Sequence, residues 1–186
     1  MTQRPGLLDG KSVLVTAAAG TGIGFATAMR CAEEGARVVI SDIHERRLRE
    51  SAEQLGGVPA VLANVTSEDD VQRLVAETID VCGGIDVLVN NAGLGGTARL
   101  TEMTDEEWYK VLDVTLTGTM RMTRATLRHM CERGAGAIVN NSSVVTLARF
   151  GCMASDGATA FTRTLCGAAS TAAHRVNAST PALAAA

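Results

Sequence analysis

A glycine-containing turn occupies residues 16–24, where the sequence is TAAAGTGIG. It follows a short β-branched run at residues 13–16 and leads into a helical pattern that begins at Phe25. Small residues allow a backbone to approach a pyrophosphate, and the unpaired N–H groups of a helix N-terminus favour its negative charge. The segment therefore predicts a strand, a phosphate-binding turn and a helix in direct succession.

An acidic residue follows the turn at the distance that a dinucleotide site requires. Asp42 ends the second β-branched run, about 20 residues after the turn, where a carboxylate accepts hydrogen bonds from an adenosine ribose. A carboxylate repels the 2'-phosphate of NADP, so NAD is the predicted cofactor and NADP the less favoured one. Arg46 and Arg47 could reverse this preference, although a solvated helix face is the commoner place for such charges.

Short β-branched runs alternate with longer helical periods along the whole chain, a pattern that predicts βαβ units. Strands are expected at residues 13–16, 37–41, 58–63, 86–90, 137–141 and 175–178, and helices at 44–56, along 71–82, from Thr104 through Thr119, and at 157–173. The predicted fold is α/β, a Rossmann-like doubly wound parallel sheet of six strands ordered 3-2-1-4-5-6. Residues 1–186 are expected to form one nucleotide-binding domain, with a short alanine-rich tail at 180–186.

The composition excludes several classes of protein. With 186 residues, 20 acidic and 17 basic side chains, the chain has a net charge of -3 and no basic character suited to nucleic acid. No apolar run approaches the roughly 20 residues of a membrane span. The five cysteines are scattered without metal-ligand spacing, which predicts no metal site, reduced thiols and a cytoplasmic location.

Several motifs resemble those of the short-chain dehydrogenases/reductases in order and spacing. They are the turn at 16–24, Asp42, Asn64-Val65, Asn90-Asn91-Ala92-Gly93, the run 138–143 ending in Ser142-Ser143, and the run 175–178 with Pro181. The likeness covers residues 7–183 and is similar in kind to bacterial 3-oxoacyl and sterol-degradation reductases. It implies hydride transfer between NAD(P) and a small secondary alcohol or ketone.

The resemblance also implies a role for individual residues. The backbone of Thr21, Gly22, Ile23 and Gly24 would hold the pyrophosphate, Asp42 the ribose, Asn64 and Val65 the adenine, Asn91, Ala92 and Gly93 the nicotinamide ribose, and Pro181 the nicotinamide. Asn64 replaces the family's aspartate and can accept a hydrogen bond through its amide oxygen. Ser143 matches the catalytic serine that hydrogen-bonds the substrate oxygen. Self-association would use the helices that begin at Thr104 and Gly157.

The chain departs from the family pattern at several positions. Ala17 stands where the phosphate turn usually has glycine, the turn is one residue longer, and Thr115 replaces a helix asparagine. The family's Tyr-x-x-x-Lys aligns with Gly151 and Ser155. The chain has only one tyrosine, Tyr109, and its two lysines, Lys11 and Lys110, also precede Ser143.

The missing pair removes the proton donor that ketone reduction requires, because a tyrosine serves as an acid near neutrality only beside a cation. Hydride transfer is therefore expected to be lost or strongly impaired. A substrate-covering segment and the last strand of the family are also expected to be missing. Two alternatives stay open, a non-catalytic dinucleotide-binding or assembly subunit and a decayed or frame-altered gene product.

Overall fold

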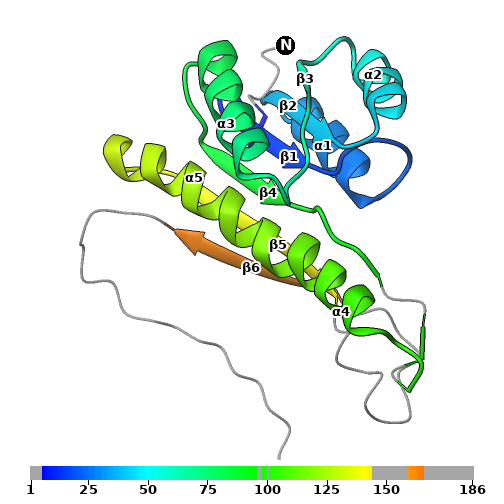
Figure 1. Ribbon diagram of the computed structural model, residues 1–186. Coiled ribbons are helices and arrows are strands. Elements are labelled where there is room, and N and C mark those ends of the chain that lie inside the picture. Colours follow the sequence, from blue (N-terminus) through cyan, green and yellow to red (C-terminus); the bar gives the residue numbers. More distant parts are fainter. Residues whose placement is uncertain (1–5, 96–97, 100, 144–158, 166–186) are drawn as a thin grey trace, which may run out of the picture.

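Five parallel strands form the centre of the structure, a computed structural model that describes residues 6–95, 98–99, 101–143 and 159–165 (Figure 1). Across the sheet they follow the order β3-β2-β1-β4-β5, which confirms the predicted order and direction of these five. They are β1 (Ser12–Thr16), β2 (Arg37–Asp42), β3 (Ala60–Leu62), β4 (Val87–Asn90) and β5 (Ala137–Ser143). The order reverses between β1 and β4, so the carboxyl ends of these two strands flank the crevice where such sheets bind ligands.

The third strand is shorter than the predicted range 58–63. Pro59 has no N–H group and cannot donate to a sheet ladder, although its carbonyl accepts a hydrogen bond from the Ile40 N–H at 3.0 Å. Regular pairing with β2 is confined to Ala60–Leu62.

Helices cover both faces of the parallel strands. Figure 1 shows α3 and α5 on one face and α1 and α2 on the other. The helices are α1 (Ile23–Glu33), α2 (Glu45–Gln54), α3 (Glu68–Cys82), α4 (Asp105–Leu112) and α5 (Gly118–Arg133), with a π-helical segment, η1 (Asp113–Thr117), between the last two. No helix in the described ranges is long and apolar enough to cross a membrane.

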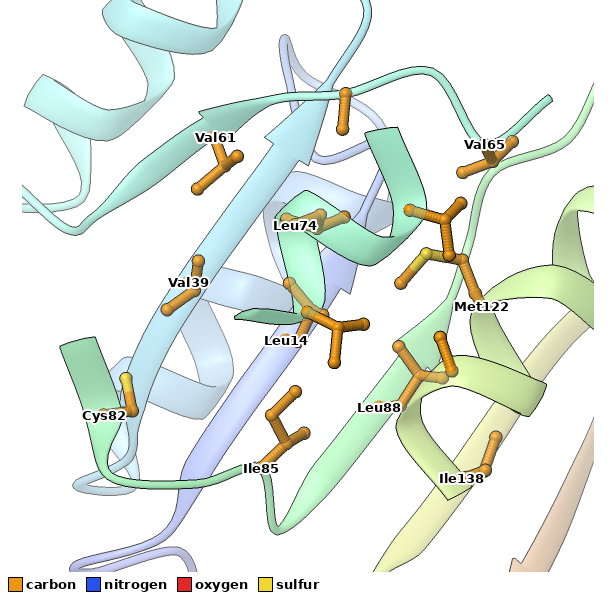
Figure 2. Packing of buried hydrophobic residues seen from close by; sticks show 14 of the residues in the cluster. Leu14, Val39, Val61, Val65, Leu74, Cys82, Ile85, Leu88, Met122 and Ile138 are labelled. Atoms are coloured by element: carbon orange, nitrogen blue, oxygen red, sulfur yellow. The ribbon is translucent and has the colours of Figure 1, made fainter. Parts of the chain in front are cut away.

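The core consists of two apolar layers, one on each side of the sheet. Leu14 and Val39 point to the layer that contains Leu74, Met122 and Ile138 (Figure 2). The residues on either side of these strand positions point to the opposite layer, beneath α1 and α2. This burial on both faces explains why the strands are continuously apolar in sequence.

Side chains cap the N-termini of α3 and α4. The Ser67 hydroxyl accepts a hydrogen bond from the Asp70 N–H at 3.3 Å. At α4, the Thr104 hydroxyl accepts from the Glu107 N–H at 3.2 Å, and the Glu107 carboxylate accepts from the Thr104 N–H at 3.0 Å. These two bonds form a capping box, and the helix predicted from Thr104 is confirmed; it continues through η1 and α5 to Arg133.

A strand replaces part of the helix predicted over residues 157–173. Strand β6 (Thr159–Leu165) pairs with β5 in the antiparallel direction, with Ser143 opposite Thr159. The helix prediction is wrong for these residues, and the sheet is mixed rather than wholly parallel. The sixth parallel strand expected at 175–178 lies outside the described residues.

The sequence of β6 explains why these residues form a strand and not a helix. Three of its seven residues are threonines, whose branched Cβ atoms favour strands over helices. Phe161 and Leu165, two apolar residues in the range 157–173, are four positions apart, an interval that is typical of one helical turn. Since that interval is an even number of residues, it fits the two-residue repeat of a strand equally well.

Candidate functional site

Hydrogen bonds join the carboxyl ends of β1, β4 and β5. The Asn91 side-chain amide donates to the carbonyls of Thr16, at 3.2 Å, and Ala17, at 2.9 Å. Its oxygen accepts from the Asn141 amide at 2.9 Å. The buried Thr16 hydroxyl accepts from the backbone N–H groups of Asn91 and Ala92, both at 3.0 Å. This network fixes the start of the turn against the loop that follows β4.

Gly24 lets α1 approach this network closely. A Cβ atom at position 24 would lie 2.5 Å from the Asn91 side-chain nitrogen and would overlap the Ala17 carbonyl oxygen. Only glycine fits there without displacing the backbone. Ala17 itself adopts a φ of 50°, the left-handed conformation that glycine favours, at the position where the sequence lacks the expected glycine.

The next three backbone N–H groups of the turn are bound to the second βα unit. Ala18 N–H donates to the Ser41 carbonyl at 3.1 Å, and Ala19 N–H to the Asp42 carboxylate at 3.2 Å. Gly20 N–H donates to the Ser51 hydroxyl at 2.9 Å. These residues therefore hold the turn to the body of the protein.

The N-terminus of α1 is left open. Its N-cap, Gly22, has no side-chain hydrogen bond, and its first turn has no acidic residue, in contrast to α3 and α4. Within the described chain, no hydrogen bond uses the backbone N–H groups of residues 21–24. A Cβ atom at Gly22 would meet nothing within 4 Å. Free donors, a helix dipole and open space together suit an anion.

Asp42 lies half-buried beside this turn. One carboxylate oxygen accepts from Ala19 N–H, and the other accepts from His44 N–H at 3.0 Å. Burial raises the pKa of Asp42, and the hydrogen bond from Ala19 and the charge of Arg47 oppose that shift. Each carboxylate oxygen can accept a further hydrogen bond, so two ribose hydroxyls could still be bound.

Asn64 and Val65, the residues expected to bind the adenine, make contacts within the protein that limit how they could bind it. The Asn64 amide oxygen accepts from both the N–H and the hydroxyl of Thr66, at 3.0 and 2.9 Å, so its acceptor capacity is used. Its NH2 group is the part of the side chain left for a ligand. Val65 is buried against Gly118, where a Cβ atom would lie 2.7 Å from the valine methyl. Only the backbone of Val65 can face a ligand.

The loop after β4 is held by the π-helical segment. The Thr115 hydroxyl accepts from Leu94 N–H at 3.1 Å and donates to the Leu94 carbonyl at 3.4 Å. Gly93, next to it, is exposed. The bonds from Thr115 and Thr16 fix both ends of the segment Ala92–Gly93, whose backbone faces the same edge of the sheet as the turn.

The remaining predicted residues lie at or beyond the end of the described site. Ser143 is the last residue of β5, at the same carboxyl edge as Asn90. Pro181, and the positions Gly151 and Ser155, lie outside the described residues. No group of His, Cys, Asp or Glu that could hold a metal ion occurs in the ranges that the structure describes.

Sequence reasoning missed the supporting contacts. It assigned no role to Ser51, which lies in a helix whose neighbouring residues, Leu48 and Ala52, read as ordinary core positions. It also assigned no partner to Asn141. These contacts join residues 31 and 50 positions apart, and local patterns give no signal for such distant pairs.

Comparison with known proteins finds relatives that align with about three quarters of this chain. The family described as short chain dehydrogenase matches residues 11–185. A reductase from Mycobacterium tuberculosis named for (5R,7aS)-5-hydroxy-7a-methyl-1-oxo-2,3,5,6,7,7a-hexahydro-1H-indene-carboxyl-CoA is 56% identical over 146 residues, which cover 75% of this chain and 56% of that protein. The 3-oxoacyl-acyl-carrier-protein reductase FabG of Thermotoga maritima is 39% identical over 142 residues, covering 74% of this chain and 57% of the relative.

A solved structure gives the corresponding structural match. The crystal structure of a short chain dehydrogenase from Mycobacterium smegmatis is 57% identical, with a TM-score of 0.73, and the match covers 75% of this chain and 61% of that one. The chain thus spans only part of the length of these relatives.

Replacing Gly24 with alanine is expected to lower the free energy of unfolding by about 1–3 kcal/mol, because the methyl group overlaps the Ala17 carbonyl and the Asn91 amide. Gly22→Ala is the matched control, since its φ is -86° and its surroundings are open, and it should stay within about 0.5 kcal/mol of wild type. Urea unfolding of the three proteins measures both effects. Equal stability of the two variants would contradict the close packing assigned to Gly24.

Proposed function

This chain belongs to the short-chain dehydrogenase family, and from that premise we propose that it binds NAD(H) through the turn at 16–24 and Asp42. The family consists of oxidoreductases that use NAD(H) or NADP(H) together with a substrate. The observation that carries the proposal is the row of free N–H groups at residues 21–24, next to the half-buried carboxylate.

The residues present fit a dinucleotide. The open space at Gly22 adjoins the uncapped end of α1, where Thr21, Gly22, Ile23 and Gly24 would hold the pyrophosphate through their N–H groups. Asp42 would bind the adenosine ribose. The free NH2 group of Asn64 would donate to an adenine ring nitrogen, in place of the acceptor role expected from sequence.

The other half of the dinucleotide would lie along the loop after β4. The backbone of Asn91, Ala92 and Gly93 is available there, because the Asn91 side chain is fully engaged in the network that joins the strands. Pro181 would border the nicotinamide. In this proposal the nicotinamide would lie near the carboxyl end of β5, where the strand ends at Ser143.

The preference for NAD over NADP follows from charge. The Asp42 carboxylate would lie beside the ribose 2'-position and would repel a phosphate there. Arg46 is paired with Glu50 at 3.0 Å, which leaves it less available to bind such a phosphate. Arg47 acts on Asp42 as a neighbouring charge. We therefore assign the net preference to NAD.

The family reaction is hydride transfer between the nicotinamide ring and a secondary alcohol or ketone, and the bound ring supplies or accepts that hydride. Ser143 would donate a hydrogen bond to the substrate oxygen. No tyrosine or lysine follows Ser143 in this sequence, so the phenol that the family pattern uses to deliver a proton to the ketone oxygen has no counterpart there. We propose that the reaction class is retained and its rate strongly reduced. The non-catalytic subunit and the altered gene product are not favoured.

The named relatives suggest a substrate class. The Mycobacterium tuberculosis relative is named for a bicyclic CoA ester and the Thermotoga maritima one for a 3-oxoacyl chain on a carrier protein. Both names describe an acyl group carried on a thiol. We propose a ketone or secondary alcohol on such a carried acyl group as the substrate of this chain.

Self-association is proposed through the outer face of η1 and α5. Leu116 is 64% exposed and Met120 is 45% exposed, on one side of a groove that also contains Thr123 and Leu127. The second helix expected to contribute, from Gly157, is a strand over Thr159–Leu165 and is not part of this proposal.

The cytoplasmic location also stays a prediction.

NADH is expected to bind wild type more tightly than NADPH, and Asp42→Ala should weaken NADH binding by about 10- to 100-fold, the effect of losing hydrogen bonds to a charged group. Affinity for NADH should also fall toward acidic pH in wild type, because burial raises the pKa of Asp42 and the protonated carboxyl group accepts fewer hydrogen bonds from the ribose. Calorimetric titration measures each affinity, with Asp80→Ala, an exposed carboxylate on α3, as the control. Tighter binding of NADPH than of NADH would contradict this, and would indicate that Arg46 or Arg47 determines the cofactor preference instead of Asp42.

Turnover of ketones with NADH is expected to be at least about 10³-fold slower than that of the Mycobacterium tuberculosis relative, since both proton donation and correct placement of the cofactor are affected. Steady-state kinetics compare wild type with Ser143→Ala and with the double variant Gly151→Tyr/Ser155→Lys, which should recover part of the rate. Ordinary turnover by wild type would contradict the assigned impairment. If Ser143→Ala then abolished that turnover, a different active site built around Ser143 would be the better account.

Met120→Glu is expected to shift the protein toward monomer by placing a charge on the apolar face of α5. Val81→Glu is the matched control, because Val81 is a comparably exposed apolar residue, at 59%, on α3. Light scattering at several concentrations measures the mass of each variant. A monomeric wild type, or equal dissociation by both variants, would contradict the proposed interface.

A further inference from the structure

We propose that Ser51 is a positioning residue for dinucleotide binding, acting through the backbone of Gly20. The Ser51 hydroxyl holds the turn in the shape that directs the N–H groups of residues 21–24 toward the phosphates. The inference rests on the proposed function, because it concerns the same binding site. It adds a residue of α2, outside the turn, to the groups that determine affinity.

Ser51 combines a buried position with a single specific contact to the turn. The residue is 2% exposed and lies among the core residues of α2, between Leu48 and Ala52 in the helix. Its hydroxyl accepts the Gly20 N–H at 2.9 Å. A serine contributes little to an apolar core, so the hydrogen bond is the feature that distinguishes this side chain from alanine at the same position.

Apart from that hydrogen bond, the side of Gly20 on which a Cβ atom would stand is open. Gly20 has a φ of 91°, and a Cβ atom there would meet nothing within 4 Å. A cavity of about 230 Å³ lies between the turn and α2 and is lined by Gly20, Thr21, Arg47 and Ser51. The Ser51 hydrogen bond joins the turn to α2 beside this cavity.

The hydrogen bond between Ser51 and Gly20 matters because of where Gly20 lies in the turn. Ala18 and Ala19 are held by β2, through the Ser41 carbonyl and the Asp42 carboxylate, and Gly20 is the last anchored residue before the free N–H groups begin at Thr21. The turn is one residue longer than the pattern it resembles, which gives this end of it more freedom. Without Ser51, about one further residue must be ordered when phosphate binds, a change that corresponds to roughly 10-fold in affinity.

The test compares NADH affinity across variants of Ser51. Ser51→Ala removes the acceptor, Ser51→Cys keeps a similar shape with a weak acceptor, and Ser51→Thr keeps the hydroxyl. Thr78→Ala is the matched control, because Thr78 is a buried helix residue, 1% exposed, whose hydroxyl bonds only within α3, to the Leu74 carbonyl at 2.7 Å. Calorimetry measures NADH binding, and hydrogen exchange measures protection of a peptide covering residues 17–24 without ligand.

Weaker NADH binding by about 10-fold in Ser51→Ala and Ser51→Cys, with faster exchange in the turn peptide and near-normal behaviour of Ser51→Thr and Thr78→Ala, would support the assignment. Unchanged affinity in Ser51→Ala would overturn it, as would equal weakening by Thr78→Ala, which would indicate a general loss of stability. If wild type itself fails to bind NADH, the proposed function fails. In that case, hydrogen exchange in the turn peptide tests only whether Ser51 holds the turn, and unchanged exchange in Ser51→Ala would overturn that role.

Discussion

The side-chain amide of Asn91 is the contact on which the site depends, because it joins three segments that lie far apart in the sequence. It donates to the carbonyls of Thr16 and Ala17 and accepts from Asn141, so every strand that reaches the crevice is tied to the turn. These bonds are partly buried, and a hydrogen-bond network whose members all have partners favours a single arrangement. The shape of the turn is therefore set by β4 and β5 as much as by its own residues. Gly24 follows from the same constraint, since it is the position at which α1 meets the Asn91 amide.

The division of backbone donors along the turn separates support from binding. The N–H groups of Ala18, Ala19 and Gly20 are bound to β2 and α2, whereas those of residues 21–24 have no partner among the residues that the structure describes. The N-termini of α3 and α4 are capped by the side chains of Ser67 and Thr104, in contrast to the N-terminus of α1. Asp42 links the two functions, because its carboxylate supports the turn and keeps acceptor capacity for a ribose. The half-buried Asp42 carboxylate would thus both support the turn and bind the ribose.

Much of the fold, and less of the site, could be predicted from sequence. The order of five strands follows from the βαβ alternation and right-handed crossovers, and it is confirmed. The helices predicted along 71–82 and from Thr104 are confirmed as well, because local periodicity and the Thr104–Glu107 spacing encode them. The interval from Phe161 to Leu165 fits a helix and a strand alike, so only pairing with β5 distinguishes them. Within the site, the turn and Asp42 could be recognised from their residue types and spacing. It could not show that Thr66 occupies the Asn64 oxygen or that Ser51 reaches Gly20, because those contacts depend on geometry beyond the pattern.

We propose that cofactor binding and proton donation are separable in this chain. The groups that would bind the dinucleotide lie in the central sheet and its first crossover, whereas the tyrosine and lysine of the family pattern are absent after Ser143. The central claim is that free N–H groups at residues 21–24 receive the phosphates. An amide NMR spectrum of the labelled protein with added ADP-ribose tests it most directly. The account predicts large shifts of the Thr21–Gly24 amides and small ones for Ala18–Gly20, whereas unchanged Thr21–Gly24 amides at saturation would contradict it.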